Sequence, residues 1–325
     1  MPTDREPAAQ LTHHAMGTVM AHHAYGPRAQ EALAAACQEV ARLEALLSRF
    51  LPASDIGRIN AAATGAGGAR PVPIALETYE LLALAADFAR RLPDSFDPTI
   101  APLVDLWRAA QAAGDPPDPP SVARVLPLVD HRDLLLDPWA RTARLRRPGQ
   151  ALDLGGIGKG YAGDRVLEVL REYGVTSAYA NLGGNVVTLG SRPDGSPWQI
   201  GIQHPRREGA ILGAVALAGG CVVTSGDYQR CFTDRQGIRR HHLLDPATGY
   251  PADSGLISVS IVADQATAAD LVSTAVFIAG LERGLGFLQH ARAEAILVDS
   301  ALRLYVTRGL RSRFRALEAP VTVLD

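Results

Sequence analysis

The 325-residue sequence has few cysteines, little net charge and no long apolar run, and each shortage excludes a class of protein. Cys37, Cys221 and Cys231 are widely spaced and form no CxxC pair, which argues against a disulfide framework and a structural zinc site. The formal net charge of -2, without a basic run that contains aromatic residues, excludes an electrostatic surface for nucleic acid. No stretch approaches the roughly 18 uninterrupted apolar residues of a transmembrane helix.

The remaining composition is that of an ordinary globular protein, with 47% hydrophobic and 20% charged residues. Its length allows one large domain or two smaller lobes. The first residues lack a charged segment followed by an apolar one, so no signal peptide is expected. Together with the scattered cysteines, this predicts a protein of the reducing cytoplasm.

Helical and strand-like patterns alternate along the chain. Apolar residues at helical spacing predict helices at 28–47 and 76–91, one near Ser121, and an alanine-rich helix from Thr267 to about Leu281. Short strand-like runs lie at 143–154, 177–190, 198–205, 213–225, 256–263 and 294–310. Turns of hairpin length, such as Pro193-Asp194-Gly195, separate many of these strands. The pattern predicts an α+β fold with mixed, largely antiparallel sheets flanked by helices.

The stretch "LDLGGIGKGYAGDRV", from Leu152 to Val166, is the strongest single candidate for a binding loop. Clustered glycines cost backbone entropy and need a reason. One reason is a tight turn from a strand into a helix; the other is a loop whose backbone approaches a phosphate, with Lys159 as counter-charge. The loop is not a Walker A motif, because Gly160 follows Lys159 where Ser or Thr would hold magnesium. Both interpretations stay open on this motif alone.

Two further polar stretches are each predicted to form a turn. Asp97-Pro98-Thr99 is typical of a turn closed by its own side chains. The stretch "TSGDYQRCF" also predicts a turn, which would expose Asp227 and Tyr228.

The stretch "RRHHLLDPATGYP" combines basic residues, two histidines and a turn, which makes a polar site plausible. Strand alternation would place His242 and Leu244 on one face and His241 and Leu243 on the other.

Asp270 and Thr274 are four residues apart, so on a helix their oxygens share a face. One interpretation is a capping box, in which Asp270 bonds back to Thr267 at the helix start. The other is an all-oxygen set for a hard cation such as Mg²⁺. No Cys/His cluster is expected to compete for a softer metal.

Taken together and in this order, these segments resemble the FAD:protein FMN transferase (flavin transferase, ApbE-type) family. The resemblance covers nearly the whole chain from about residue 12, and the ordered set of motifs is highly specific. It is carried by Met16-Gly17-Thr18, "LLSRFLPASDIGRIN", "SFDPTIAPLVDLW", "LDLGGIGKGYAGD", "NLGGN", "GIQHP", "TSGDYQR", "HHLLDPATGYPA" and "AADLVSTA". One departure is Gly57, which stands where the family commonly has serine.

The resemblance implies a fold and a set of site residues. The fold would be a two-lobed, T-fold-related single module over residues 12–325, preceded by a flexible N-terminus at 1–11. The catalytic candidates are His242, as the base, and Asp245, which would orient it or replace it. Residues implied to bind Mg²⁺ are Gly156, Asp270, Ser273 and Thr274. Residues implied to bind the flavin nucleotide are Met16, Phe50, Ser95, Phe96, Asp97, Asp153, Lys159 and Leu244.

The implied reaction moves FMN from FAD to a threonine of a target flavoprotein, forms a phosphoester bond and releases AMP. Mg²⁺ would be the cofactor, FAD a substrate, and the acceptor another protein. Two alternatives stay open: a Mg²⁺-dependent FAD pyrophosphatase that gives FMN and AMP, and a catalytically silent flavin-binding protein. Many relatives carry a lipoprotein or secretory leader, and none is expected here, which puts periplasmic residence in doubt; the periplasm stays the alternative to the cytoplasm.

Overall fold

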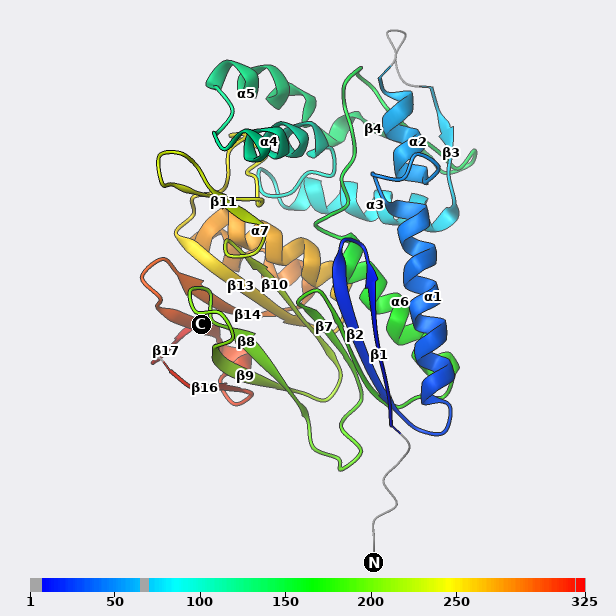
Figure 1. Ribbon diagram of the computed structural model, residues 1–325, viewed down its shortest axis with the longest axis vertical. Helices are drawn as coiled ribbons and strands as arrows, with labels where there is room; N and C mark the ends of the chain where they lie inside the picture. Colours follow the sequence, from blue (N-terminus) through cyan, green and yellow to red (C-terminus); the bar gives the residue numbers. More distant parts are fainter. Residues whose placement is uncertain (1–7, 65–69, 319, 325) are drawn as a thin grey trace, which may run out of the picture.

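The computed structural model describes residues 8–64, 70–318 and 320–324, which are built around one large sheet (Figure 1). In these residues the sheet has nine strands, in the order β1-β2-β6-β7-β10-β13-β14-β15-β17. Neighbours are antiparallel except β15 and β17, which are parallel. The predicted α+β class with largely antiparallel sheets is therefore confirmed. The strands are β1 (Ala8–Ala15), β2 (Thr18–Tyr25), β6 (Ser177–Leu182), β7 (Asn185–Leu189), β10 (Gly220–Gly226), β13 (Leu256–Ala263), β14 (Glu294–Asp299), β15 (Leu304–Thr307) and β17 (Val321–Leu324).

Three long helices cover one face of this sheet: α1 (Ala29–Leu47), α6 (Gly158–Glu172) and α7 (Ala266–Leu285). α1 lies against β1, α6 against β7, and α7 against β10 and β13. In α1, Leu33, Val40 and Leu47 recur at helical spacing and are buried, as an amphipathic helix requires. α7 extends beyond the predicted end and is kinked at Gly280, whose φ of 80° lies outside the helical region.

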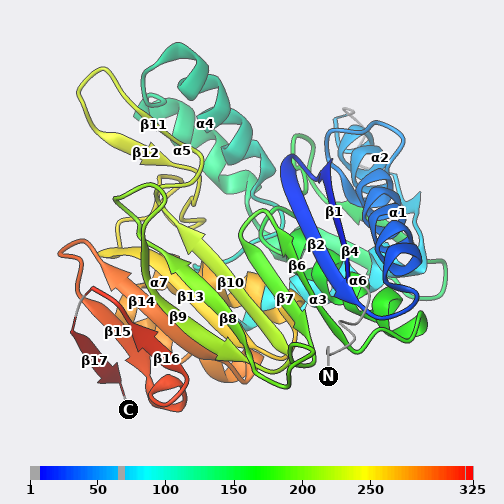
Figure 2. The same cartoon turned by 60° about the horizontal axis from the view of Figure 1, so that its bottom comes forward.

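A small sheet covers the other face (Figure 2). Apolar side chains of β9, such as Val215 and Leu217, meet Val222 and Ile296 of the large sheet in a second core. This sheet has the order β16-β9-β8 and consists of β8 (Trp198–Gln203), β9 (Ile211–Leu217) and β16 (Phe314–Ala316). The turn at Pro193-Asp194-Gly195, which has hairpin length, joins β7 of the large sheet to β8 of the small sheet and therefore closes no hairpin.

Most of the remaining elements lie beyond one end of the large sheet, at the top of Figure 1. The predicted helix at 76–91 is confirmed as α3 (Leu76–Arg91), and the one near Ser121 as α5 (Pro119–Val125). Sequence analysis did not predict α2 (Asp55–Ala62), α4 (Ala101–Ala113) or the β1–β2 hairpin. The other strands are β3 (Val72–Pro73), β4 (Leu134–Asp137), β5 (Thr142–Leu145), β11 (Cys231–Thr233) and β12 (Arg239–His241), and the short 3₁₀ segments span Leu126–Leu128, His131–Asp133, Leu288–Ala291 and Arg308–Leu310.

The N-terminal hairpin corrects one domain boundary. Residues 1–11 were expected to be flexible, but residues 8–11 form the start of β1, paired with β2; residues 1–7 lie outside the described residues. Met16 and Gly17 connect the two strands with φ values of 50° and 70°. Positive φ at both central residues is the geometry of a type I′ turn, which suits the twist of a two-residue hairpin.

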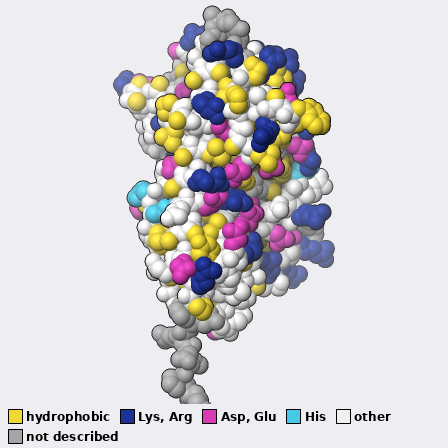
Figure 3. Space-filling model, turned by 90° about the vertical axis from the view of Figure 1, so that its right-hand side faces the viewer, with side chains coloured by type: hydrophobic (Ala, Val, Ile, Leu, Met, Phe, Trp, Pro, Cys, Tyr) yellow, Lys and Arg dark blue, Asp and Glu magenta, His cyan; other side chains and the backbone are white. Residues whose placement is uncertain are grey.

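The surface over α1 and α6 carries charges of both signs. Figure 3, which views the right-hand side of Figure 1, shows basic and acidic side chains interspersed there. Arg42 of α1 pairs with Glu39 at 2.7 Å and with Glu77 of α3 at 2.6 Å, and Arg165 of α6 pairs with Glu39 at 3.1 Å. This face therefore has no single-sign field of the kind that attracts nucleic acid. Among the described helices, none is long and apolar enough to cross a membrane.

Candidate functional site

The candidate site begins where α6 and α7 cap each other. Asp164 of α6 accepts hydrogen bonds from the backbone N–H groups of Ala266 (2.8 Å) and Thr267 (2.9 Å) at the start of α7. In return, Asp270 of α7 accepts one from the N–H of Gly160 in the first turn of α6 (2.8 Å). The predicted capping box is therefore wrong: Asp270 binds the neighbouring helix, because the two N-termini lie side by side.

This close approach explains part of the glycine cluster. A Cβ at Gly160 would lie 2.2 Å from the carbonyl oxygen of Ala266, and one at Gly163 would lie 2.8 Å from Val187 Cγ1. Both positions need glycine so that α6 can pack against α7 and the sheet. A Cβ at Gly158 would meet no described atom within 4 Å, so packing does not explain that glycine.

The carboxylate of Asp270 is the most buried charge of the site, with 3% of the residue exposed. Its Oδ1 accepts a hydrogen bond from Asn185 Nδ2 (3.0 Å), while its Oδ2 holds the N–H of Gly160. The ammonium of Lys159 lies 3.7 Å from Oδ1. A buried carboxylate must be paired or hydrogen-bonded, and these three groups stabilise it.

Three hydroxyl groups cluster beside the backbone of Asp270, where α7 meets the end of β10. Ser225, at the end of β10, lies 2.9 Å from Ser273 Oγ and 3.3 Å from Thr274 Oγ1, and Ser273 also donates to the carbonyl of Asp270 (2.9 Å). A Cβ placed on Gly156 would be 3.7 Å from Thr274 Oγ1, so the loop before α6 reaches the same place. The groups that could bind a metal ion here all offer oxygen atoms, the ligands that hard divalent cations prefer.

The loop before α4 is held by its own hydrogen bonds. Asp97 accepts from the N–H (2.8 Å) and hydroxyl (2.6 Å) of Thr99, and from the N–H (2.8 Å) and Nδ1 (3.1 Å) of His131. The fully buried Ser95 donates to the carbonyl of Pro93 (3.2 Å). The predicted turn chemistry of Asp97 is thus present, and its carboxylate orders the loop around Phe96.

An open cavity of about 310 Å³ lies beside this loop. Its lining includes Phe96, His131 and Arg132, together with Pro246 from the turn after Leu244. Phe96 also borders the glycine-rich loop, since its ring lies 3.3 Å from a Cβ placed on Gly156. The cavity therefore joins motifs that are far apart in the sequence.

An exposed aromatic ring stands between two arginines at the edge of the site. Phe50 is 64% exposed, and the guanidinium carbons of Arg49 and Arg108 lie 5.1 and 4.8 Å from its ring centroid. Arg49 also pairs with Asp153 at 3.1 Å, and Asp153 accepts a hydrogen bond from the N–H of Gly155 (2.7 Å). An aromatic face flanked by cations suits a planar, anionic ligand.

His241 and its neighbours do not follow the predicted alternation. β12 ends at His241, and Leu243 and Leu244 are both buried, so the chain leaves the strand before it can alternate. His241 contacts the carbonyl of Ala252 through Nε2 (3.1 Å) and packs edge-on against Phe277. These contacts are those of a structural residue, so we expect replacement of His241 to destabilise the fold.

His242 keeps an accessible side chain, although protein atoms crowd around it. Desolvation by those atoms, followed by the positive charges of Arg230, His241 and Lys159, lowers the pKa of His242 to about 4. The imidazole is thus neutral at pH 7, as a base must be, but its pKa is well below the near-neutral value expected from an unperturbed histidine. Oδ1 of Asp245 accepts a hydrogen bond from the N–H of Ala247 (2.8 Å).

The turn after β10 also differs from its prediction. Asp227 is buried and forms two hydrogen bonds of 2.7 Å with Arg206, while Tyr228 is half-buried. The expectation that both side chains are exposed is wrong for Asp227, because two hydrogen bonds to the guanidinium of Arg206 compensate its desolvation.

Comparison with known proteins decides the family. The ApbE family model matches residues 16–297. The chain is 36% identical over 290 residues to the FAD:protein FMN transferase of Klebsiella pneumoniae, covering 89% of this chain and 88% of the relative. It is 32% identical over 323 residues to the enzyme of the same name from Treponema pallidum, covering 94% and 88%. The chain belongs to the ApbE family.

Solved structures agree with this ApbE assignment. The ApbE protein of Thermotoga maritima matches with a TM-score of 0.86 at 29% identity, covering 95% of this chain and all of that one. The flavinyl transferase ApbE of Pseudomonas stutzeri matches with a TM-score of 0.79 at 28% identity, covering 92% and 93%.

Several residues of this ApbE-family site were not among the predicted set. Asn185 and Ser225 hold Asp270 and its hydroxyl neighbours, Arg49 and Arg108 flank Phe50, and Arg230 acts on His242. The motifs "NLGGN", "TSGDYQR" and "LLSRF" contain four of these five residues. Only the three-dimensional contacts single them out within those motifs.

Proposed function

We propose that this chain is a Mg²⁺-dependent FAD:protein FMN transferase, with the chain from β1 onward as its catalytic module. It would move FMN from FAD to a threonine hydroxyl of another protein and release AMP. The observation that carries the proposal is the buried Asp270 carboxylate, 3.7 Å from Lys159, in a chain of the ApbE family. That arrangement suits the charge that develops in a pyrophosphate under attack.

The residues around Asp270 fit Mg²⁺. A carboxylate, the hydroxyl of Thr274 and the backbone of Gly156 provide hard oxygen donors within one small region. We assign these three as ligands, and Ser273 as a positioning residue, because its fully buried hydroxyl bonds Ser225 and the Asp270 carbonyl. Bound Mg²⁺ would supply Lewis-acid stabilisation of the phosphoryl oxygens.

Lys159 supplies the protein's own positive charge at this point. It is the only lysine in the sequence and lies in the first turn of α6, whose N-terminus also favours phosphate. Gly158 beside it leaves the backbone open, as close approach of a phosphate requires. We infer that Lys159 holds the pyrophosphate while Asp270 fixes the position of its ammonium.

In the transfer step, the threonine oxygen bonds to the phosphorus of the FMN half, and the bond from that phosphorus to the AMP oxygen breaks. The hydroxyl proton passes to the neutral ring of His242, and AMP leaves. Desolvation, followed by positive charges that include those of Arg230 and Lys159, lowers the pKa of His242. A bound pyrophosphate would offset those charges and raise its pKa, so the base would strengthen when FAD is bound. Asp245 is the alternative base.

The flavin nucleotide has two candidate contact regions. Phe50, exposed between Arg49 and Arg108, provides a stacking surface for a planar ring. The open cavity beside Phe96 offers a second surface near the glycine-rich loop. We propose that Met16, Ser95, Asp97 and Leu244 shape these surfaces: Asp97 by ordering its loop, Leu244 by packing beneath its turn, and Met16 from the hairpin turn.

Incubation with FAD, Mg²⁺ and a candidate acceptor tests the proposal. The expected result is a fluorescent flavin band on a denaturing gel at the mass of the acceptor, with one AMP released per flavin attached. Release of FMN and AMP without a covalent band would indicate a pyrophosphatase. FAD binding without AMP release would indicate a silent flavin-binding protein. Either result contradicts the transferase assignment.

We also propose that the protein works in a reducing compartment, the cytoplasm, with the periplasm as the alternative. Among the described residues Cys37, Cys221 and Cys231 are all free thiols. Three titratable thiols in denatured protein, purified without reductant, would support the cytoplasm, whereas a Cys221–Cys231 disulfide would contradict it.

A further inference from the structure

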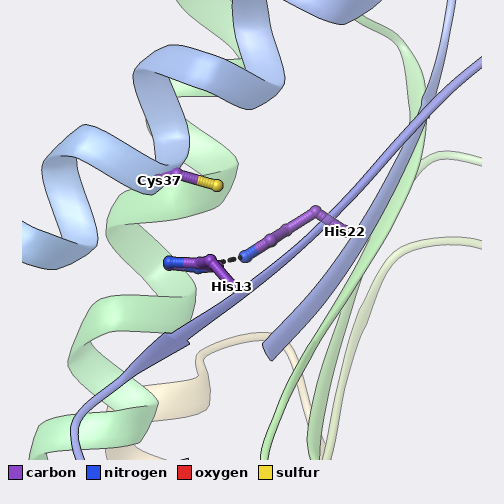
Figure 4. Close-up of side chains that lie close together, drawn as sticks. All are labelled: His13, His22 and Cys37. Carbon is purple, nitrogen blue, oxygen red and sulfur yellow. Dashed lines mark hydrogen bonds between the residues drawn. The ribbon is translucent and has the colours of Figure 1, made fainter. Parts of the chain in front are cut away.

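Two histidines and a cysteine meet outside the flavin site, between the N-terminal hairpin and α1 (Figure 4). His13 lies on β1, His22 on β2 and Cys37 on α1, and one ligand atom from each lies within 4.8 Å of the other two. The expectation that no Cys/His cluster exists is therefore wrong. The spacing of the three residues in the sequence matches no metal motif. They meet only because α1 packs on the β1–β2 hairpin.

His22 is the central residue of this cluster. It is fully buried, and its Nε2 lies 2.9 Å from Nε2 of His13. Its Nδ1 is also buried, and no described group hydrogen-bonds to it. Leaving this buried Nδ1 unpaired costs about 1–3 kcal/mol, at a residue whose Nε2 faces the ring of His13.

Strand alternation turns His13 toward α1 and the adjacent His14 away from it. His13 is half-buried and turns toward α1, whereas the next residue, His14, is exposed. Cys37 is half-buried on the facing side of α1, so the cluster is open to a small ion. Glu44, two turns further along the same helix, places negative charge near His13.

We propose that His13, His22 and Cys37 bind a divalent ion of the zinc class, which ties the β1–β2 hairpin to α1. Two neutral imidazoles and a thiolate suit Zn²⁺, with water in the fourth position. Tetrahedral Zn²⁺ separates such ligand atoms by about 3.3–3.6 Å. The 2.9 Å between the ring nitrogens and the 4.8 Å limit of the cluster bracket this range, so small side-chain shifts suffice.

Binding would release the thiol proton of Cys37 to solvent and leave both imidazoles neutral. Since Nε2 of His13 and Nε2 of His22 share one hydrogen bond, one of them carries a proton, which would move to Nδ1 of the same ring when both nitrogens bind the ion. The ion would brace the hairpin whose turn holds Met16, which itself donates its N–H to Glu44 of α1 (2.9 Å). This nitrogen–sulfur site differs in chemistry from the all-oxygen set around Asp270.

Co²⁺ substitution of the full chain, without an affinity tag, tests this site. Cys37→Ser and His13→Gln remove ligands, while Cys231→Ser and His14→Gln are the matched controls. The parent and both controls should show visible d–d bands and a near-ultraviolet thiolate-to-Co²⁺ band, which one equivalent of Zn²⁺ abolishes. The thiolate band should be absent from Cys37→Ser, and both spectral features should weaken in His13→Gln.

A second measurement needs no substitution and so does not depend on how a variant folds. The parent protein is alkylated with iodoacetamide with and without Zn²⁺, and each cysteine peptide is quantified by mass spectrometry. Zn²⁺ should slow alkylation of Cys37 more than tenfold and leave Cys231 unchanged. Equal alkylation of Cys37 with and without Zn²⁺, or a thiolate band that survives in Cys37→Ser, would overturn the proposal and leave a hydrogen-bonded histidine pair.

Discussion

Asp270 offers the sharpest test of the site, because its carboxylate has a structural and a chemical role that two substitutions separate. Asp270→Ala removes the acceptor for the N–H of Gly160 and for the amide of Asn185. Each buried donor left without a partner costs about 1–3 kcal/mol, so the alanine variant should lose about 2–6 kcal/mol of unfolding free energy. That exceeds the loss of an ordinary capping contact.

Asp270→Asn keeps the shape and removes the charge. Its amide oxygen can accept from Gly160, and Asn185 can rotate its own amide to accept from the new NH₂ group. Lys159 loses a partner, but its side chain is 24% exposed and reaches water. The loss of stability should therefore stay below about 2 kcal/mol, whereas Mg²⁺-dependent transfer should fall by more than ~10²-fold.

Asp164→Asn is the matched control, because Asp164 joins the same two helices without belonging to the proposed metal set. It should lose about 0.5–2 kcal/mol of stability, as caps do, and keep its Mg²⁺ dependence. Urea unfolding followed by circular dichroism measures stability, and covalent flavin fluorescence against Mg²⁺ concentration measures function. Normal Mg²⁺-dependent transfer by Asp270→Asn would refute the metal assignment, and an alanine variant as stable as the parent would refute the hydrogen-bond reasoning.

Four further outcomes test the rest of the site. His242→Ala should bind FAD normally but transfer FMN ~10²–10⁴-fold more slowly, whereas His241→Ala should lower the melting temperature; equal, mild effects in both would move the base elsewhere. The kcat/KM for FAD, which reports the free enzyme, should stay level from pH 7 down and fall near pH 4 as His242 gains its proton; a fall centred near pH 6.5 would contradict the lowered pKa. Phe50→Ala should raise the Kd for FAD by roughly 5- to 150-fold, the range of lost ring stacking, without changing stability; an unchanged Kd would exclude stacking there. Because Lys159 is the only lysine, FAD should protect it from acetylation while the N-terminal amine still reacts, as peptide mass spectrometry would measure; equal acetylation with and without FAD would remove Lys159 from the pyrophosphate site.

Local patterns in the sequence were enough to predict the class of fold and the family. Apolar residues at helical spacing predicted α1 and α3, because an amphipathic helix must bury one stripe whatever it packs against. The order of the motifs identified the ApbE family, since motif order along a chain needs no coordinates. The same signals missed α4 and the β1–β2 hairpin, where turn residues and histidines obscured the pattern.

The partner of each polar side chain was decided only by the tertiary structure. Asp270 matched a capping box locally, yet it binds Gly160 and Asn185 on other elements. His22 and Cys37 gave no motif, yet they lie together because α1 packs on the hairpin. Propensity and periodicity act over a few residues of chain, whereas hydrogen bonds, desolvation and metal ligation depend on distances in space. Those distances exist only after the helices have packed on the sheet.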